Sequence, residues 1–289
     1  MTEAMRAATL AGCAAALIGC SSGPPTPAQV GAQLFADPAL SQPSGASCAD
    51  CHAAAVAFRD PESDHSTSMG SVAGRFGARN APSAMYARFV PPLRRDAAGN
   101  WAGGLFWDGR ASSLEDQAGL PLLHPLEMNN PDQAGVVAAV RRASYAQAFR
   151  DAFGAGALDD DAAAFRRITA ALAAFERTRA FAPFSSKYDR YLAGRDELTP
   201  SERHGLALFE DPARGNCASC HPSRPGPDGS PPLFTSFGYA NLGIPRYGNS
   251  KFFDQPAAFN PDGEGFIDHG LMTTVGDPGQ DGKFRIPTL

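Results

Sequence analysis

Apolar residues recur every three or four positions in two long stretches in the middle of the chain, at residues 132–153 and 160–181. In the first stretch, for example, they run from Val136 to Phe153. This spacing lines apolar side chains along one face of a helix. We therefore predict that each stretch is a single amphipathic helix.

Two further helices are predicted by shorter signals. Residues 28–40 are expected to form one of them, just before a cysteine-rich segment. Thr199-Pro200-Ser201-Glu202 is a capping box with proline at the first helical position, so the other helix, and with it a second domain, begins near Thr199. Residues 52–128 and 222–282 are rich in Gly, Pro and polar residues that interrupt every periodic run, which predicts loops. The fold class predicted is mostly α and loop-rich.

The same five-residue motif follows both of these shorter helices. It is Cys48-Ala49-Asp50-Cys51-His52 in the first case and Cys217-Ala218-Ser219-Cys220-His221 in the second. C-x-x-C-H is typical of c-type haem attachment, in which both thiols form thioethers with the haem. The histidine next to them is then held under the iron as its proximal ligand. The chain is therefore predicted to carry two haem c groups, with His52 and His221 on the two irons.

A shared lead-in strengthens the haem interpretation. Gly31-x-x-Leu34-Phe35-x-Asp37 precedes the first motif and Gly205-x-x-Leu208-Phe209-x-Asp211 precedes the second. A repeated unit of helix and haem site accounts for this similarity. The alternative is a zinc site made of the four thiolates from both motifs.

Length and composition agree with one haem in each of two tandem cytochrome-c-like domains. The 289 residues correspond to about two domains, which we place at 29–198 and 199–289. Glycine and proline number 30 and 25, as expected of loop-rich domains whose cores are completed by a large apolar cofactor. A net charge of −5 argues against a nucleic-acid partner, which would require a basic surface.

The N-terminus has the features of a targeting signal. Residues 7–19 are 13 mostly apolar residues, too few to span a bilayer, and they end at Leu17-Ile18-Gly19-Cys20, which is similar to a bacterial lipobox. We expect a signal peptide at 1–20, a tether at 21–28 and a periplasmic protein anchored by lipid on Cys20, with no other membrane contact. The alternative is an ordinary secretory signal with incidental cysteines at Cys13 and Cys20.

Over about 31–289 the chain resembles the bacterial di-haem cytochrome c peroxidases and their MauG relatives, which mature a tryptophan-derived cofactor in methylamine dehydrogenase. Besides the haem motifs, the matching segments are Arg79-Asn80-Ala81-Pro82-Ser83, Phe106-Trp107-Asp108-Gly109-Arg110, Leu114-Glu115-Asp116-Gln117-Ala118, Pro125-Leu126-Glu127-Met128, Phe234-Thr235 and Phe284-Arg285-Ile286-Pro287-Thr288-Leu289.

The resemblance implies roles for individual residues. The first haem would react with peroxide and the second would transfer electrons. Gln117 and Glu127 would line the distal pocket of the first haem, and Trp107 would lie between the two haems. Asn80 would be one ligand of a calcium ion.

Elementary chemistry is consistent with two of these roles. Splitting a bound peroxide requires a proton to move from the near oxygen to the far one, which a carboxylate such as Glu127 can do as a general acid–base. An indole such as that of Trp107 is readily oxidised and can relay electrons. The alternatives are a solvated loop carboxylate and a core aromatic residue.

The function implied is reduction of hydrogen peroxide to water, with electrons from a small c-type cytochrome or a cupredoxin entering through the second haem. One alternative is MauG-like oxidation of a residue in a protein substrate. Another is a di-haem electron carrier without catalysis, which would be expected to have both irons six-coordinate.

Two departures from the family pattern matter. The peroxidases have a histidine eight residues before the motif asparagine, where this chain has Val72, preceded by Ser71. We therefore expect an open first iron, with His65 as the candidate substitute ligand. The sixth ligand of the second haem and the remaining calcium ligands would lie beyond Leu289, so we expect a truncated chain.

Overall fold

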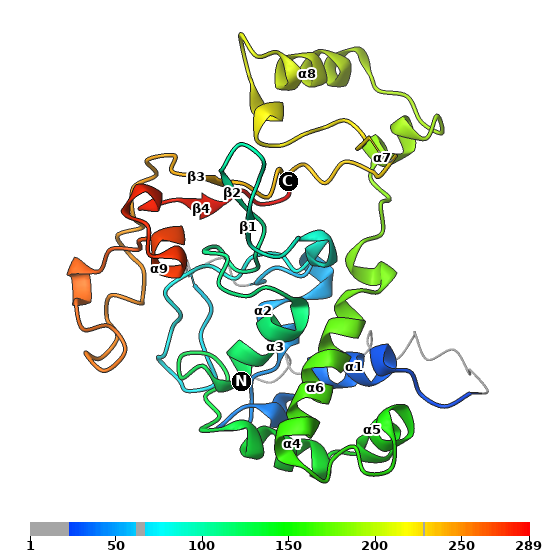
Figure 1. Cartoon of the computed structure of the whole chain (residues 1–289), viewed down its shortest axis with the longest axis vertical. Coiled ribbons are helices and arrows are strands. Elements are labelled where there is room, and N and C mark those ends of the chain that lie inside the picture. Colours follow the sequence, from blue (N-terminus) through cyan, green and yellow to red (C-terminus); the bar gives the residue numbers. More distant parts are fainter. Residues whose placement is uncertain (1–22, 62–66, 228) are drawn as a thin grey trace, which may run out of the picture.

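A computed structural model describes residues 23–61, 67–227 and 229–289 of the chain. Its centre is a group of helices around α6 (Asp161–Glu176), which packs against α1 (Pro27–Phe35), α3 (Leu114–Leu123) and α4 (Gln133–Arg142), with α5 (Ala146–Phe153) at the periphery (Figure 1). The predicted mostly α, loop-rich fold is confirmed. The signal peptide, Cys20 and His65 lie outside the described residues.

The crossing of α1 and α6 is unusually close at Gly31. A Cβ atom on Gly31 would lie 1.9 Å from the carbonyl oxygen of Ala171. Val30 and Leu34, on either side of this glycine, are fully buried. The capping box of Thr26 and Gln29 begins α1 with its first N–H groups satisfied. The glycine of the repeated lead-in therefore allows two backbones to touch in the first domain.

The long predicted helices are shorter in the structure. Residues 132–153 form α4 and α5, because the chain turns at Ala143, whose N–H bonds back to Val140, and buries Tyr145 against Asp37. The prediction for 160–181 is right only as far as Glu176, after which a short 3₁₀ turn follows.

Two other expectations need correction. The helix predicted for 28–40 stops at Phe35, because Pro38 begins a separate turn capped by the Asp37 side chain. The stretch 52–128 is not all loop, since α3 starts at the Ser113 cap within it. Gly119 and Pro121 inside α3 hide it from pattern-based prediction.

The remaining elements are short. They are the helices α2 (Cys48–Cys51), α7 (Lys187–Leu192), α8 (Pro200–Glu210) and α9 (Leu271–Val275), and two antiparallel strand pairs, β1 (Arg94–Arg95) with β2 (Trp101–Ala102) and β3 (Tyr239–Ala240) with β4 (Phe284–Arg285). Turns of 3₁₀ helix lie at Pro38–Leu40, Ala54–Val56, Ala87–Phe89, Arg179–Phe181, Cys217–Ser219, Gly263–Gly265 and Pro278–Gln280. The capping box at Thr199 begins α8 as predicted.

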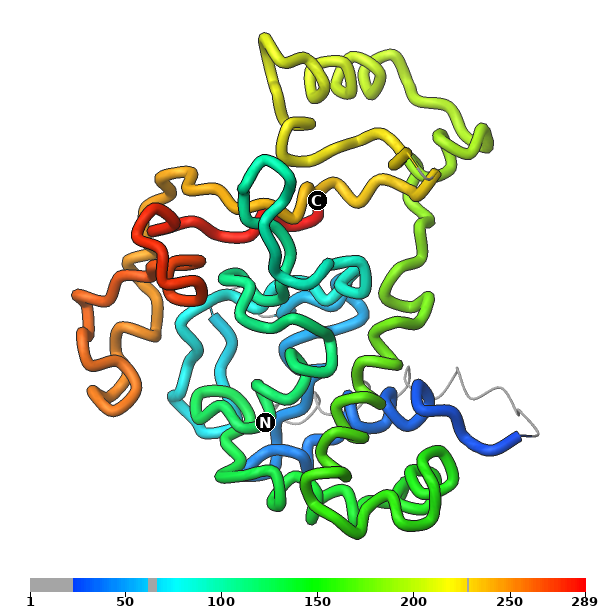
Figure 2. The backbone as a smooth tube through the Cα atoms, in the orientation of Figure 1, coloured from blue at the N-terminus to red at the C-terminus, as the bar shows by residue number. Residues whose placement is uncertain are grey.

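After the second motif, the chain returns to the first domain. The orange and red C-terminal segment in Figure 2 lies beside the cyan and green part of the chain. Gly103 N–H donates to the carbonyl of Phe237 at 2.9 Å, and Arg285 N–H donates to that of Trp107 at 2.8 Å. Within the ranges that the structure describes, no helix is long and apolar enough to cross a membrane.

Candidate functional site

A cavity of about 450 Å³ lies between the helical core and the returning C-terminal segment. Its wall contains every residue that the sequence assigned to the first site, which are Cys48, Cys51, His52, Asn80, Trp107, Gln117 and Glu127. α2 supplies the thiols, α3 supplies Gln117 and the loop after α3 supplies Glu127. These residues are far apart in the sequence but share one cavity.

The two motif histidines are oriented in the same way. Nδ1 of His52 lies 3.0 Å from the carbonyl oxygen of Phe58, and Nδ1 of His221 lies 2.6 Å from that of Phe234. Because a carbonyl oxygen can only accept, Nδ1 carries the proton in both rings and Nε2 is left with its lone pair free for a metal. Phe58 and Phe234 both have left-handed backbones, with φ of 52° and 50°. Burial also lowers the pKa of His52, which favours the neutral imidazole that an iron ligand requires.

The first pair of thiols is protonated at neutral pH. Burial raises the pKa of Cys48 to about 12 and that of Cys51 to about 11, although both keep some surface open to the cavity. Cys217 is exposed and belongs to the distant turn after α8 (Figure 1). Among the described residues, which include all four motif cysteines, no group of three metal-binding side chains comes together. The described residues therefore do not assemble a four-thiolate zinc site.

Glu127 faces the cavity from a loop that is fixed by hydrogen bonds. Its carbonyl accepts from the Ser71 N–H at 2.7 Å, and its own N–H donates to the His124 carbonyl. Its Oε1 lies 3.4 Å from Nδ1 of His124. His124 is the residue at which α3 ends, and nothing in the sequence indicated that it would lie beside this carboxyl. Burial raises the pKa of Glu127, and the charges of His124 and Arg110 oppose that shift. A carboxyl with a raised pKa holds a proton more readily than an ordinary glutamate and can accept one and return it.

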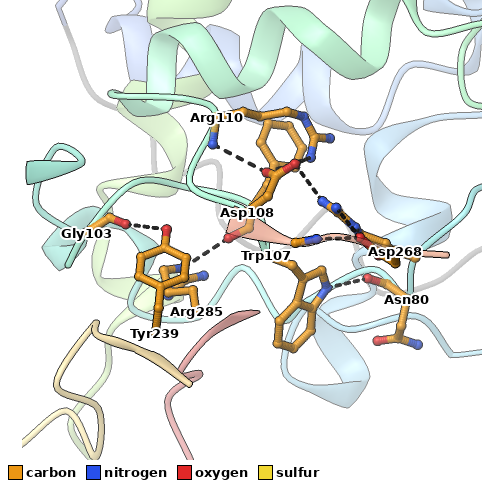
Figure 3. Close-up of polar contacts among 11 residues, drawn as sticks. Asn80, Gly103, Trp107, Asp108, Arg110, Tyr239, Asp268 and Arg285 are labelled. Atoms are coloured by element: carbon orange, nitrogen blue, oxygen red, sulfur yellow. Dashed lines mark hydrogen bonds and ion pairs between the residues drawn. The ribbon is translucent and has the colours of Figure 1, made fainter. Parts of the chain in front are cut away.

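Trp107 is held firmly on the cavity wall (Figure 3). Its indole Nε1 donates to the carbonyl of Asn80 at 2.8 Å. The next side chain, Asp108, is 5% exposed and accepts from Arg79 at 2.7 Å and from Arg110 at 2.9 Å. Gly109 follows with φ of +76°, and a Cβ there would come within 2.2 Å of the Tyr239 hydroxyl. The orientation of the indole is therefore set by both domains.

Two arginines on this wall differ in their partners. Arg79 bridges Asp108 and Asp268, and although burial lowers its pKa, the hydrogen bond to Asp268 and the two negative charges raise it overall. Arg285 donates from Nε to the carbonyl of Phe106 at 3.0 Å but forms no ion pair with any described residue. Burial lowers the pKa of Arg285. A partly buried cation without an ion-pair partner among the described residues could face an anionic group of a ligand in the cavity, and the sequence showed Arg285 only as part of a motif.

The second motif is less enclosed by the described residues. No residue of α8 is buried. His221 bonds to the carbonyl of Phe234. The ring of Phe234 packs edge-on against Tyr188 and Phe209, with ring centroids 5.4 and 6.0 Å apart.

The loop at 67–77 presents Ser68, Met69 and Gly70 to the cavity. Val72, at the position of the peroxidases' histidine, is not among the cavity-lining residues. The described part of this loop therefore brings no imidazole to the first site, in agreement with the sequence.

Two c-type haem motifs, a cavity that gathers the first motif with Gln117 and Glu127, and a mostly α fold define a di-haem peroxidase-type protein. Residues 25–197 match the family described as di-haem cytochrome c peroxidase, and the chain belongs to this family. The chain is 42% identical over 268 residues to the methylamine utilization protein MauG of Paracoccus denitrificans, covering 91% of this chain and 67% of that protein.

Two further relatives are more distant. Cytochrome c peroxidase Ccp of Escherichia coli is 34% identical over 202 residues, covering 68% of this chain and 38% of that protein. The crystal structure of the diheme peroxidase BthA from Burkholderia thailandensis superimposes with a TM-score of 0.79 at 38% identity, covering 92% of this chain and 65% of that one. The chain thus spans about two thirds or less of the length of these three proteins.

Proposed function

We propose that this protein reduces hydrogen peroxide to water, taking electrons from a small c-type cytochrome or a cupredoxin through its second haem. The observation that carries the proposal is the convergence of Glu127, Gln117 and His52 on one cavity. A cavity with a proximal ligand and a carboxyl of raised pKa is what peroxide cleavage requires.

The first site fits a covalently bound haem. Cys48 and Cys51 would form the thioethers, Nε2 of His52 would be the iron ligand, and the guanidinium of Arg285, which Phe106 engages only through Nε, would face a carboxylate of the cofactor. When bound, the haem would supply the iron at which peroxide is reduced. Cys217, Cys220 and His221 would hold the second haem.

Glu127 would move the proton. Its carboxylate oxygen takes a proton from the peroxide oxygen nearer the cavity floor and returns it to the outer oxygen, which leaves as water. Overall, one hydrogen peroxide, two protons and two electrons give two waters. Gln117 offers an amide that can donate to or accept from the same oxygens.

Trp107 would carry electrons toward the first site. Its ring lies on the cavity wall, and its Nε1 hydrogen bond to Asn80 gives it a fixed orientation. A fixed, partly buried indole changes geometry little when it is oxidised.

Two other functions compete with this proposal. The 42% identity to MauG and the valine at position 72 favour MauG-like oxidation of a residue in a protein substrate. A pure electron carrier is not favoured, because it has no use for Glu127 and Gln117 in the cavity.

The direct test is a donor-oxidation assay. The haem-loaded protein should oxidise a reduced small c-type cytochrome only when hydrogen peroxide is added, with two cytochromes oxidised per peroxide. The Cys217→Ser/Cys220→Ser variant should stop oxidising the donor because it lacks the second haem. If peroxide is consumed while a residue of an added protein is oxidised and the donor is not, the MauG-like alternative is favoured. If the protein does not react with peroxide, both functions are contradicted.

Localisation and haem content can be tested together by mass spectrometry. We propose export to the periplasm, supported by the apolar segment ending at Cys20 and by the two haem motifs. The mature protein from an exporting bacterial host should begin at Cys20, carry lipid there and show two covalent haem additions. Cys20→Ser should lose the lipid and become soluble in the periplasmic fraction. An unmodified N-terminus or a single haem would contradict the corresponding part of the proposal.

We also propose Asn80 as a calcium ligand, which the family resemblance supports. Asn80 lies on the wall beside Trp107, and the described residues supply no cluster of carboxylates around it. No step above depends on calcium. Elemental analysis of the purified protein and of Asn80→Ala decides the point, because equal calcium in both would remove Asn80 from the site.

A further inference from the structure

We propose that Glu176 is a proton-uptake residue that couples reduction of the first haem to binding of one proton. The inference rests on haem attachment at Cys48 and Cys51 and not on the peroxidase activity, so the two can fail separately. Nothing in the sequence pattern marked Glu176, which looks like the polar end of an amphipathic helix.

Glu176 is the last residue of α6, yet it is 7% exposed and lines the cavity. No described residue forms a hydrogen bond or an ion pair with its side chain. Burying a carboxylate without a partner is costly, so burial disfavours the charged form of Glu176 and raises its pKa. An unpaired carboxyl facing a cavity is better placed to respond to charge in that cavity than to stabilise the fold.

Few charged groups face Glu176. Arg177 follows it in the chain, but its guanidinium is engaged by Glu115 of α3 at 2.6 and 2.9 Å. The Cys48 thiol of α2 interacts electrostatically with Glu176, and α1 contributes no titratable side chain to the contact. Burial raises the pKa of Glu176 to about 7, with Arg177 lowering it and Glu115 raising it.

The coupling follows from charge. When an electron reaches the first haem from a reductant, the positive charge beside Glu176 falls by one unit. The carboxylate then loses a favourable interaction, so its pKa rises and it takes a proton from water to become a carboxylic acid. Glu176 lies close to the point of attachment, since it interacts electrostatically with the Cys48 thiol, which would form one of the bonds to the haem. The reduced site thus holds one of the protons that peroxide reduction consumes.

The test is the reduction potential of the first haem against pH, measured by spectroelectrochemistry on the haem-loaded protein without peroxide. A fully coupled proton changes the potential by about 59 mV per pH unit for one electron. Because the pKa of Glu176 lies near 7, we expect a clear fraction of this slope around neutral pH in the wild type and a flat dependence in Glu176→Gln. The matched control is Glu115→Gln, which removes the neighbouring exposed carboxylate and should keep the slope. An unchanged slope in Glu176→Gln would overturn the proposal, as would its loss in Glu127→Gln instead.

A second measurement covers the case in which Glu176→Gln fails to fold or to load haem. Proton uptake on reduction of the unmodified protein can be followed with an indicator dye in unbuffered solution near pH 7. A fraction of a proton per electron is expected, accompanied by a carboxylic acid C=O band in the reduced-minus-oxidised infrared spectrum. Reduction without proton uptake or without that band would overturn the proposal.

Discussion

Replacing Glu127 with glutamine should slow the reaction of the haem-loaded protein with hydrogen peroxide by about 10²–10⁴-fold. The amide keeps the shape of the side chain but can no longer take and return the proton. Because the pKa of Glu127 is raised, its carboxylate is protonated at a higher pH than that of an ordinary glutamate. As the pH is lowered, the wild-type rate should therefore begin to fall at a correspondingly higher pH. Stopped-flow absorbance on the all-ferric protein measures both effects.

Two controls belong to this experiment. Glu115→Gln changes a carboxylate on α3 that pairs with Arg177 and should leave the peroxide rate unchanged. The resting first iron should be high-spin in the wild type and in Glu127→Gln, since neither Val72 nor Ser71 can serve as the peroxidases' histidine does. A low-spin iron that becomes high-spin in His65→Ala would show instead that a relocated histidine closes the site.

Alanine at Gly31 and alanine at Gly205 should have opposite effects, although the two glycines occupy the same place in the repeated lead-in. A Cβ on Gly31 would collide with the Ala171 carbonyl at 1.9 Å, so α1 and α6 must separate, at a cost of about 3 kcal/mol or more. Gly205 lies inside α8 with no atom within 4 Å of such a Cβ. Alanine there should stabilise the helix by about 1 kcal/mol through its higher helix propensity.

Urea unfolding followed by circular dichroism measures both changes. Equal shifts of the unfolding midpoint in the two variants would contradict the close crossing of α1 and α6. Gly31→Ser provides a second test, since the Cβ atom of serine would collide with the Ala171 carbonyl as that of alanine does.

The sequence predicts what is encoded locally. The haem motifs, the Thr199 capping box and the start of α1 depend on neighbouring residues, and the structure has them where expected. α3 escaped detection because Gly119 and Pro121 interrupt its pattern, yet its packing against α6 maintains the helix. Secondary structure at such positions is decided by tertiary contacts.

The candidate site shows the same division. Glu127, Gln117 and Trp107 were found through motif spacing, and the structure brings them to one cavity. Glu176 and Arg285 were missed as participants because their importance comes from where the fold places them on the cavity wall, Glu176 buried and Arg285 partly buried. Phe252, Phe259 and Phe266 also line the cavity, although they follow the second motif in the chain. No short-range pattern can reveal contacts of that length.

The returning segment also has a consequence for biosynthesis. Asp268 meets Arg79 across 189 residues, and Arg285 meets Phe106 across 179, so the last wall of the first cavity comes from residues synthesised long after Cys48 and Cys51. Before that segment docks, the cavity beside Cys48 and Cys51 would lack the wall that Phe252, Phe259, Phe266 and Arg285 supply. Bringing such distant segments together is slow, because the intervening loop must first be closed. We therefore expect the two thiols to be most accessible before the C-terminal segment docks, and docking to enclose whatever group is attached to them.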